Sequence, residues 1–243
     1  MRLKDRVAIV TGGGQGIGRA ICLTFAREGA NIIIAEHNQS TAEAVAKEVS
    51  ALGVRSLAIA TDVSNGDAVH AMVAQTLEAF GRIDILVNNA GTFTHTRIEE
   101  CTEAEWDRIM AVNLKGPFFC AQAVMGGMKQ QKSGRIINLG SLAGRIGGIF
   151  ASAPYAASKA GVMCLTKSLA RILGEYGITV NAIAPGVAET EMTKGHPDLR
   201  SQIPLGRVAD ATEVANVALF LASDEGSYLT GVTVDVNGGL LMP

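Results

Sequence analysis

The chain has 243 residues, 48% of them hydrophobic and 5% aromatic, and its 21 lysines and arginines against 23 aspartates and glutamates give a net charge of −2. This length suits one large α/β domain or two small ones, and the apolar share is sufficient for a substantial core. A balanced charge without a basic block, together with few aromatic residues, argues against nucleic acid or a membrane as a partner.

The composition also bears on the compartment. The segment Met1–Val10 holds only a short apolar run, too short for the apolar region of a signal peptide. No stretch approaches the roughly 18 apolar residues of a membrane span. The four cysteines form no C-x-x-C pair and fit buried positions in a reducing compartment. We therefore expect a cytoplasmic protein, and the four scattered histidines lead us to expect no metal site.

Short β-branched runs alternate with longer amphipathic segments along the chain. Strands are predicted at Val7–Val10, Asn31–Ala35, Ser56–Ala60, Ile83–Val87, Arg135–Leu139, Thr179–Ile183 and Val232–Val236. Helices are predicted at Gly16–Gly29, Ser40–Leu52, Gly66–Phe80, Thr102–Met128, Tyr155–Tyr176 and Thr212–Leu221. Apolar strands separated by helices are typical of a parallel sheet covered on both faces. We therefore expect a single α/β domain over residues 1–243, of the doubly wound Rossmann type, with a seven-stranded parallel sheet and helices on both faces.

The first predicted strand leads into a glycine-rich run, Thr11–Gly18, and a helix follows. Glycines let the backbone approach a pyrophosphate closely, and the helix N-terminus offers its N–H groups to the anion. Glycines also make ordinary turns. Here the strand before, the helix after and an acid at the right distance, Glu36, together favour a dinucleotide site.

Glu36 lies at the end of the second predicted strand. Its carboxylate could accept hydrogen bonds from both adenine-ribose hydroxyls and would repel a 2′-phosphate. Gln15 occupies the loop position where a phosphorylated cofactor would favour a cation, although His37 could carry partial positive charge. We therefore expect NAD, with NADP less favoured. A solvated acid at a strand end is the alternative interpretation of Glu36.

Tyr155 and Lys159 are four residues apart on a predicted helix, so they share a face. A phenol has a pKa of about 10, and a neighbouring ammonium favours the phenolate. Bringing that pKa to about 7 takes about 4 kcal/mol of differential stabilisation. The pair therefore predicts an acid/base centre, although helices also carry such pairs by chance.

Ser141 follows the predicted strand Arg135–Leu139, at the edge where active sites open in this architecture. Its hydroxyl would hydrogen-bond the substrate oxygen beside Tyr155. A simple turn serine is the alternative, because Gly140 and Gly144 flank it. Further along, residues 185–206 are rich in proline and glycine, which favours a substrate loop at about 187–206 over a passive surface insertion.

These motifs resemble the short-chain dehydrogenase/reductase family, in its branch of about 250 residues, over the whole chain. The resemblance rests on seven motifs in the family's order: Thr11–Gly18, Asp62-Val63, Asn88-Asn89-Ala90-Gly91, Asn113 within Val112–Gly116, Ser141, Tyr155-x-x-x-Lys159 and Pro185-Gly186. Seven ordered matches are far more specific than any one of them.

The resemblance implies a nicotinamide cofactor and a catalytic set of Ser141, Tyr155, Lys159 and Asn113. The cofactor-binding positions are then Gly12, Gln15, Gly16, Ile17, Gly18, Glu36, Asp62, Val63, Asn89, Ala90, Gly91, Tyr155, Lys159, Pro185, Gly186, Val187 and Thr190. By the same resemblance Tyr155 exchanges the proton, Lys159 binds the nicotinamide ribose, and Asn113 bends its helix and holds a water. A solvent-facing polar residue in mid-helix is the alternative for Asn113.

Substrate residues are predicted from their place along the chain. His95, Leu142, Ala143, Ser152 and Met192 could line a mixed, mildly polar pocket, although a solvated loop histidine is the more ordinary interpretation of His95.

Two substrate classes remain open. Glu36 and Gln15 favour an NAD-linked dehydrogenase of polyols, sugars or small hydroxy compounds. The alternative is an NADPH-dependent 3-oxoacyl-thioester reductase acting on acyl-carrier protein, supported by Lys132 and Arg135. Such reductases tend to show a basic patch on the later helix. Tyr176 occupies that place here, which argues against this alternative.

Two classes without catalysis are also open, a redox-sensing nucleotide binder and a scaffold protein. Both predict loss of the four catalytic residues, and all four are present. The predicted helix Tyr155–Tyr176 is apolar nearly all round, which is typical of a helix buried on two sides. The resemblance implies that this helix and Thr102–Met128 pair across subunits, so we expect a homotetramer, with a dimer as the alternative.

Overall fold

The computed structural model describes residues 1–148, 151–189 and 198–242. In this part of the chain seven parallel strands form one sheet in the order β3-β2-β1-β4-β5-β6-β7. The strands are β1 (Val7–Thr11), β2 (Asn31–Glu36), β3 (Ser56–Ala60), β4 (Ile85–Asn88), β5 (Gly134–Leu139), β6 (Ile178–Pro185) and β7 (Thr233–Val236). The predicted fold is confirmed, and every predicted strand lies within two residues of an observed one at each end.

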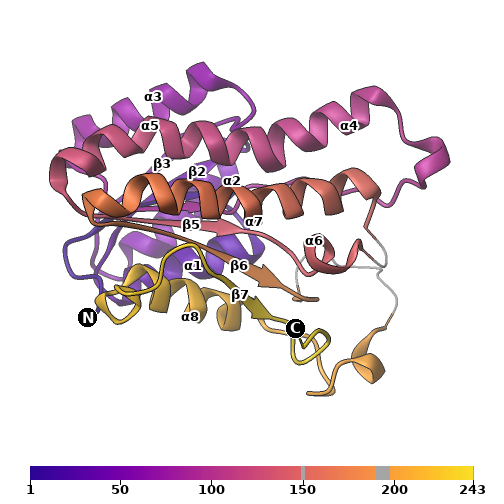
Figure 1. Cartoon of the computed structure of the whole chain (residues 1–243). Helices are drawn as coiled ribbons and strands as arrows, with labels where there is room; N and C mark the ends of the chain where they lie inside the picture. The colour runs from indigo at the N-terminus through magenta and orange to yellow at the C-terminus, as the bar shows by residue number, and fades with distance from the viewer. Residues whose placement is uncertain (149–150, 190–197, 243) are drawn as a thin grey trace.

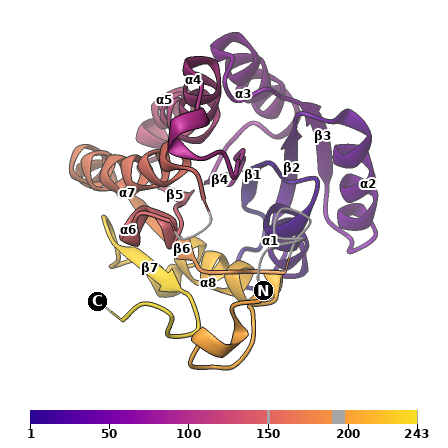
Figure 2. The same cartoon turned by 90° about the vertical axis from the view of Figure 1, so that its right-hand side faces the viewer.

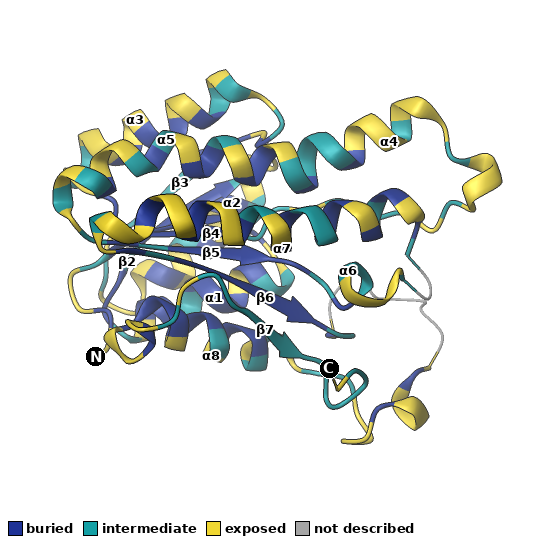
Figure 3. Ribbon diagram, viewed as in Figure 1, coloured by how far each residue is buried: buried dark blue, intermediate teal, exposed yellow. Residues whose placement is uncertain are grey.

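Helices cover both faces of the sheet (Figures 1 and 2). One layer contains α1 (Gly16–Arg27), α2 (Gln39–Ser50) and α8 (Ala211–Ala222), whose buried side chains share a core with β1, β2 and β4. The other contains α3 (Gly66–Phe80), α5 (Gly116–Gln131) and α7 (Ala153–Leu173). Figure 3 shows the strands buried between these layers and the outer faces of the helices exposed. The central strands are largely apolar because they meet helices on both sides, whereas the edge strands β3 and β7 are only partly buried.

The order of the sheet reverses at β1, which pairs with β2 on one side and β4 on the other. Such a switch point leaves a crevice at the carboxyl ends of the strands, where ligands bind in this architecture. The Thr11 hydroxyl lies at this point and accepts hydrogen bonds from the backbone N–H groups of Asn89 and Ala90, both at 3.1 Å. The end of β1 is thereby fixed to the segment that follows β4.

The predicted helix Thr102–Met128 is interrupted. It divides into α4 (Glu103–Met110), a π-helical turn (Ala111–Lys115) and α5. Within the turn the Asn113 side chain is buried at 1% exposure, so the solvent-facing alternative is wrong. A single turn of π-helix bends the axis and is often found beside functional sites.

The region after β6 is described in part. Ala188 forms a bridge with Ala209, and a short 3-10 turn covers Arg200–Gln202. The predicted substrate loop, about 187–206, therefore lies partly outside the described residues, and with it Thr190 and Met192. Among the residues described, no helix combines the length and the hydropathy that crossing a membrane requires.

Candidate active site

The glycine-rich turn connects β1 to α1. Gly12 and Gly16 have φ of +62° and +50°, a left-handed conformation that glycine adopts without strain. A Cβ atom on Gly18 would lie 2.0 Å from the Gly12 carbonyl oxygen, so no larger residue fits there. Gln15 precedes α1 and makes no side-chain cap, which leaves the first N–H groups of the helix without a side-chain acceptor. The turn therefore fits a pyrophosphate, both in shape and in its free donors.

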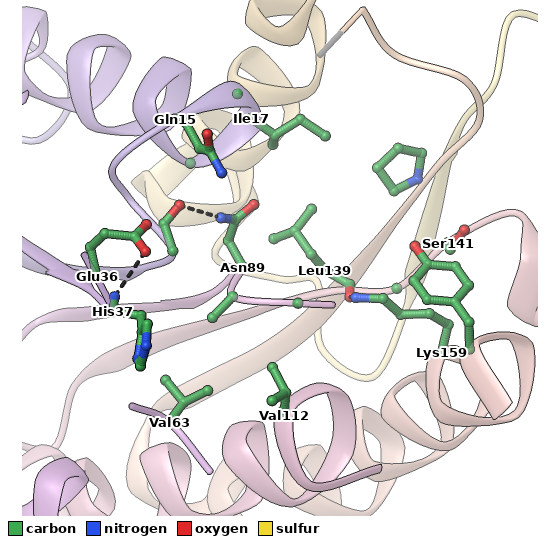
Figure 4. A pocket seen from close by; sticks show the side chains of 18 of the residues that line it. Gln15, Ile17, Glu36, His37, Val63, Asn89, Val112, Leu139, Ser141 and Lys159 are labelled. Carbon is green, nitrogen blue, oxygen red and sulfur yellow. Dashed lines mark hydrogen bonds between the residues drawn. The ribbon is translucent and has the colours of Figure 1, made fainter. Parts of the chain in front are cut away.

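A cavity of about 530 Å³ opens beside this turn, at the carboxyl ends of the strands (Figure 4). It is lined by Gly12, Gln15, Gly16, Ile17, Gly18, Glu36, His37, Thr61, Asp62, Val63, Ser64, Asn89, Ala90, Gly91, Arg108, Val112, Leu139, Gly140, Ser141, Tyr155, Lys159, Pro185, Gly186 and Ala188. Among the described residues predicted to bind the cofactor, Val187 alone does not line it. The prediction did not include eight of the lining residues, and all of these except Val112 lie outside the seven motifs: His37, Thr61, Ser64, Arg108, Val112, Leu139, Gly140 and Ala188.

Two carboxylates define the end of the cavity next to β2 and β3. Glu36 accepts hydrogen bonds from the backbone N–H of Gly14 at 3.1 Å and of His37 at 2.8 Å. Asp62 accepts from the hydroxyl and the backbone N–H of Ser64, at 2.7 and 2.9 Å. The pKa of Asp62 is lowered, chiefly by the bond from the Ser64 hydroxyl and further by the nearby His37. This end therefore suits hydroxyl or amine donors better than a phosphate.

The opposite end contains Lys159 and Tyr155 on α7. The Lys159 ammonium donates to the Leu139 carbonyl oxygen at 2.7 Å and lies 5.7 Å from the centre of the Tyr155 ring. Burial lowers the pKa of Lys159 to about 8. Burial raises the pKa of Tyr155, while a hydrogen bond with Ser141 acts in the opposite direction. In the chain without a bound cofactor, the Tyr155 phenol is therefore protonated at neutral pH, and this is the form that can donate a proton.

The raised pKa of Tyr155 differs from the sequence-based expectation of a phenol brought towards pH 7. The physical reason is that loss of water around the ring is the largest influence on it. The Lys159 ammonium alone does not reverse that effect. The positive charge of an oxidised nicotinamide would act in the same direction as Lys159.

Ser141 lies just beyond β5 and is held by its own turn. Its side-chain oxygen accepts from the Ala143 backbone N–H at 3.1 Å, and its carbonyl accepts from the Gly144 N–H at 3.0 Å. The hydroxyl is thus directed at Tyr155 in the cavity rather than only closing a turn. Ser141 and Tyr155 therefore share a hydrogen bond, with the Lys159 ammonium beside the Tyr155 ring, at the place where a carbonyl could bind.

Asn113 lies behind this group and does not line the cavity. Its amide donates to the Thr92 carbonyl at 2.9 Å and to the Ser158 hydroxyl at 3.1 Å, and its oxygen accepts from the Thr92 N–H at 2.8 Å. Ser158 in turn donates to the Tyr155 carbonyl at 2.7 Å. The Asn113 side chain thus joins the segment after β4 to α7, the helix that contains Tyr155 and Lys159.

Of the predicted substrate residues, Met192 lies outside the described part of the chain, and His95, Leu142, Ala143 and Ser152 do not line the cavity. Ser152 is 3% exposed and its hydroxyl lies 2.8 Å from that of Thr94. Leu142 is buried, and Ala143 begins the short helix α6 (Ala143–Ile146) beside Ser141. His95 lies on the exposed loop after β4, where its ring stacks edge-on against Phe93 at 4.7 Å. Among the described residues, no cluster of three histidine, cysteine or acidic side chains could hold a metal ion.

Comparison with known proteins gives three kinds of match. The family described as enoyl-(acyl carrier protein) reductase matches residues 12–241. A 3-oxoacyl-[acyl-carrier-protein] reductase FabG from Staphylococcus epidermidis is 45% identical over 98% of this chain and 100% of its own length. The (2S)-[(R)-hydroxy(phenyl)methyl]succinyl-CoA dehydrogenase subunit BbsD of Thauera aromatica is 43% identical over 98% of both chains.

The fold has close counterparts among solved structures. The crystal structure of a short-chain type dehydrogenase/reductase from Mycobacterium marinum superposes with a TM-score of 0.95. It is 34% identical in sequence, and the match covers 99% of this chain and 97% of that one.

Proposed function

Because the chain belongs to the short-chain dehydrogenase/reductase family, and is therefore a nicotinamide-dependent oxidoreductase, we propose that its substrate is a 3-oxoacyl thioester. The relatives support this choice. One is named for a 3-oxoacyl group on acyl-carrier protein and the other for a hydroxy-substituted acyl group on CoA. We therefore replace the sequence-based preference for polyols or sugars by the substrate of its alternative, the 3-oxoacyl thioester, without taking over the NADPH of that alternative.

The observation that carries the carbonyl chemistry is the meeting of Ser141, Tyr155 and Lys159 in one cavity, while the relatives carry the choice of a thioester. A carbonyl oxygen between the hydroxyls of Ser141 and Tyr155 would receive a hydrogen bond from each. When bound, a nicotinamide cofactor exchanges hydride with the carbonyl carbon. Tyr155 donates its proton to the oxygen, which completes the hydroxyl group and leaves a phenolate beside Lys159.

Lys159 has donors to spare for this step. An ammonium has three N–H groups, and the Leu139 carbonyl occupies one. The other two are available for a ribose hydroxyl of the cofactor and for the phenolate. Oxidation of a 3-hydroxyacyl thioester follows the same path in reverse, with the phenolate accepting the proton.

For the cofactor we propose NADH over NADPH. The backbone N–H groups of Gly14 and His37, which could hold a 2′-phosphate, already donate to the Glu36 carboxylate. Asp62 adds a second negative charge at the same end of the cavity. A phosphate there would meet two carboxylates, whereas ribose hydroxyls would find acceptors.

The test of the substrate is a set of initial rates. We expect acetoacetyl-CoA reduction with NADH to exceed NAD-linked oxidation of sugars and polyols by at least about tenfold in kcat/KM. Faster polyol or sugar oxidation would overturn the thioester assignment and leave the catalytic group in place.

The test of the cofactor is Glu36→Ala. Removing the carboxylate frees the N–H groups of Gly14 and His37 and removes the repulsion of a 2′-phosphate. We expect the ratio of kcat/KM for NADH to that for NADPH to fall about tenfold or more. Glu43→Ala, an exposed acid on α2, is the control and should leave the ratio unchanged. An unchanged ratio in Glu36→Ala would show that Glu36 does not read the ribose.

A further inference from the structure

The segment Thr92–Thr96 leaves the end of β4 and brings an aromatic side chain against Tyr155. The Phe93 ring meets the Tyr155 ring edge to face, with centroids 4.9 Å apart and planes at 81°. The His95 ring stacks on Phe93 in the same manner, at 4.7 Å and 88°. Phe93 is half-buried and lies against the Tyr155 ring, next to the cavity lining that includes Tyr155 but not itself part of it. None of the seven family motifs includes this residue.

The residue before Phe93 is held by two helices. The Thr92 hydroxyl accepts from the Arg108 guanidinium at 2.8 Å. The Thr92 backbone binds the Asn113 amide through both its N–H and its carbonyl. Position 92 therefore has a fixed side chain and a fixed backbone.

The residues after Phe93 are held by one carboxylate. Thr94 donates to one oxygen of Glu105 at 2.6 Å, and Thr96 donates to the other at 3.0 Å. Hydrogen bonds to a carboxylate are among the stronger ones in proteins, and here both oxygens are engaged. These bonds also lower the pKa of Glu105, the one from Thr94 most. The carboxylate on α4 thus fixes the loop on the far side of Phe93.

A further contact ties the loop to the helix that contains Tyr155. The Ser152 backbone N–H donates to the Thr94 carbonyl at 3.0 Å, and the two hydroxyls lie 2.8 Å apart. Ser152 immediately precedes α7. Hydrogen bonds therefore join the loop that contains Phe93 to the start of the helix that contains Tyr155, and these bonds fix the two rings relative to each other.

We propose that Phe93 forms the wall of the substrate site beside Tyr155 and restricts the acyl group, and that Glu105 is the positioning residue that holds it there. The substrate named here rests on the proposed function. A rigid aromatic wall next to the proton donor accepts an unbranched, apolar chain on the carbonyl carbon. It obstructs a substituent at C2 and offers no partner to the hydroxyls of a sugar.

The first experiment compares acetoacetyl-CoA with 2-methylacetoacetyl-CoA, using NADH. One methyl group in a close-fitting site changes kcat/KM about 10- to 200-fold. We expect Phe93→Ala to raise the ratio of branched to unbranched kcat/KM at least tenfold, and Phe93→Leu, which keeps apolar bulk, to raise it less. An unchanged ratio in Phe93→Ala would overturn the proposal.

The second experiment needs no substrate. Phenolate absorbance is titrated in the wild type and each variant, and the signal of the matching Tyr155→Phe protein is subtracted to isolate Tyr155. Burial raises the pKa of Tyr155, so Phe93→Ala, which admits water, should move its titration to lower pH. Phe93→Leu should move it less, and it also serves if the alanine variant folds poorly.

The same titration tests Glu105. We expect Glu105→Gln to shift Tyr155 in the direction of Phe93→Ala and to raise KM more than it lowers kcat. Glu103→Gln, an exposed acid in the first turn of the same helix, should change neither.

The two experiments separate the two proposals. If the wild type reduces neither thioester, the proposed function fails, and the Tyr155 titration still decides whether Phe93 shields the phenol. If Phe93→Ala leaves that titration unchanged, Phe93 does not cover Tyr155 and the wall assignment is wrong.

Discussion

At the scale of single residues, Lys159 shows how the site opposes stability. Its ammonium is 5% exposed, and burial brings its pKa from the ordinary 10.5 to about 8. Between these two values the unfolded chain binds more protons than the folded one, so stability rises with pH across that window. Below pH 8 the ammonium is charged in both states, and the whole desolvation penalty is present.

This penalty predicts the behaviour of Lys159→Met. The substitution keeps a long flexible side chain and removes the buried charge, so it should raise the free energy of unfolding by about 2 kcal/mol at pH 7. The gain should shrink as pH rises from 8 towards 10.5, because the wild-type lysine then becomes neutral. Urea denaturation of the wild type and of Lys159→Met at pH 7 and pH 10 measures this gain in stability. The variant should be inactive at both pH values. A gain that is equal at both values would contradict the assignment of a charged, buried Lys159.

At the scale of elements, the sequence predicted the strands better than the helices. A run of β-branched residues between turns marks a strand by itself, and this held even for the short edge strand β7. The resemblance implied a bend at Asn113, but the hydrophobic pattern did not show the division into two helices, because apolar residues continue across the π-helical turn from Ile109 to Cys120. Pro117, in the first turn of α5, was the available signal for a new helix start.

The sequence also predicted one part of the candidate site better than the other. Its cofactor half is made of strand ends and a glycine turn, and their spacing along the chain is enough to reveal them. The substrate wall proposed above depends on Phe93, Thr94 and Glu105, which lie outside the cavity lining and meet only after folding. A lone threonine or glutamate carries no signal of such a contact, and the sequence therefore favoured His95 and Ser152 instead.

The turn before α1 gives a prediction about an element. Gly18→Ala places a Cβ 2.0 Å from the Gly12 carbonyl oxygen, so the turn must open, at about 1–3 kcal/mol of stability and with weaker NADH binding. In Gly126→Ala the new Cβ meets no atom within 4 Å, on an exposed position of α5. That control should stabilise the protein by up to about 1 kcal/mol. Urea denaturation and NADH fluorescence titration measure both, and wild-type NADH affinity in Gly18→Ala would refute the role of the turn.

At the scale of the whole molecule, the outer helices leave apolar side chains in water. Trp106 on α4, Phe118 on α5 and Ile172 on α7 are 43%, 41% and 56% exposed. The helix α7 was expected to be buried on two sides, and in the single chain only one side is covered (Figure 3). An uncovered apolar face of this kind is typical of a subunit interface.

We therefore propose a homotetramer assembled through these helices. Light scattering during size-exclusion chromatography should give about four times the chain mass of 25.3 kDa. Phe118→Glu and Ile172→Glu place a charge in the proposed interface and should give smaller species. Arg171→Glu, an exposed position that is already polar, is a milder control on the same helix. A monomeric wild type would refute the assembly.

The way Phe93 is held has an evolutionary consequence. The loop after β4 is fastened by polar side chains, among them the buried Asn113 and Ser152, and none of these belongs to the hydrophobic core. If Phe93 restricts the acyl group as proposed, a mutation there alters what the enzyme accepts and leaves the sheet undisturbed. Selectivity can thus drift by single codon changes in a lineage whose fold and cofactor chemistry stay constant.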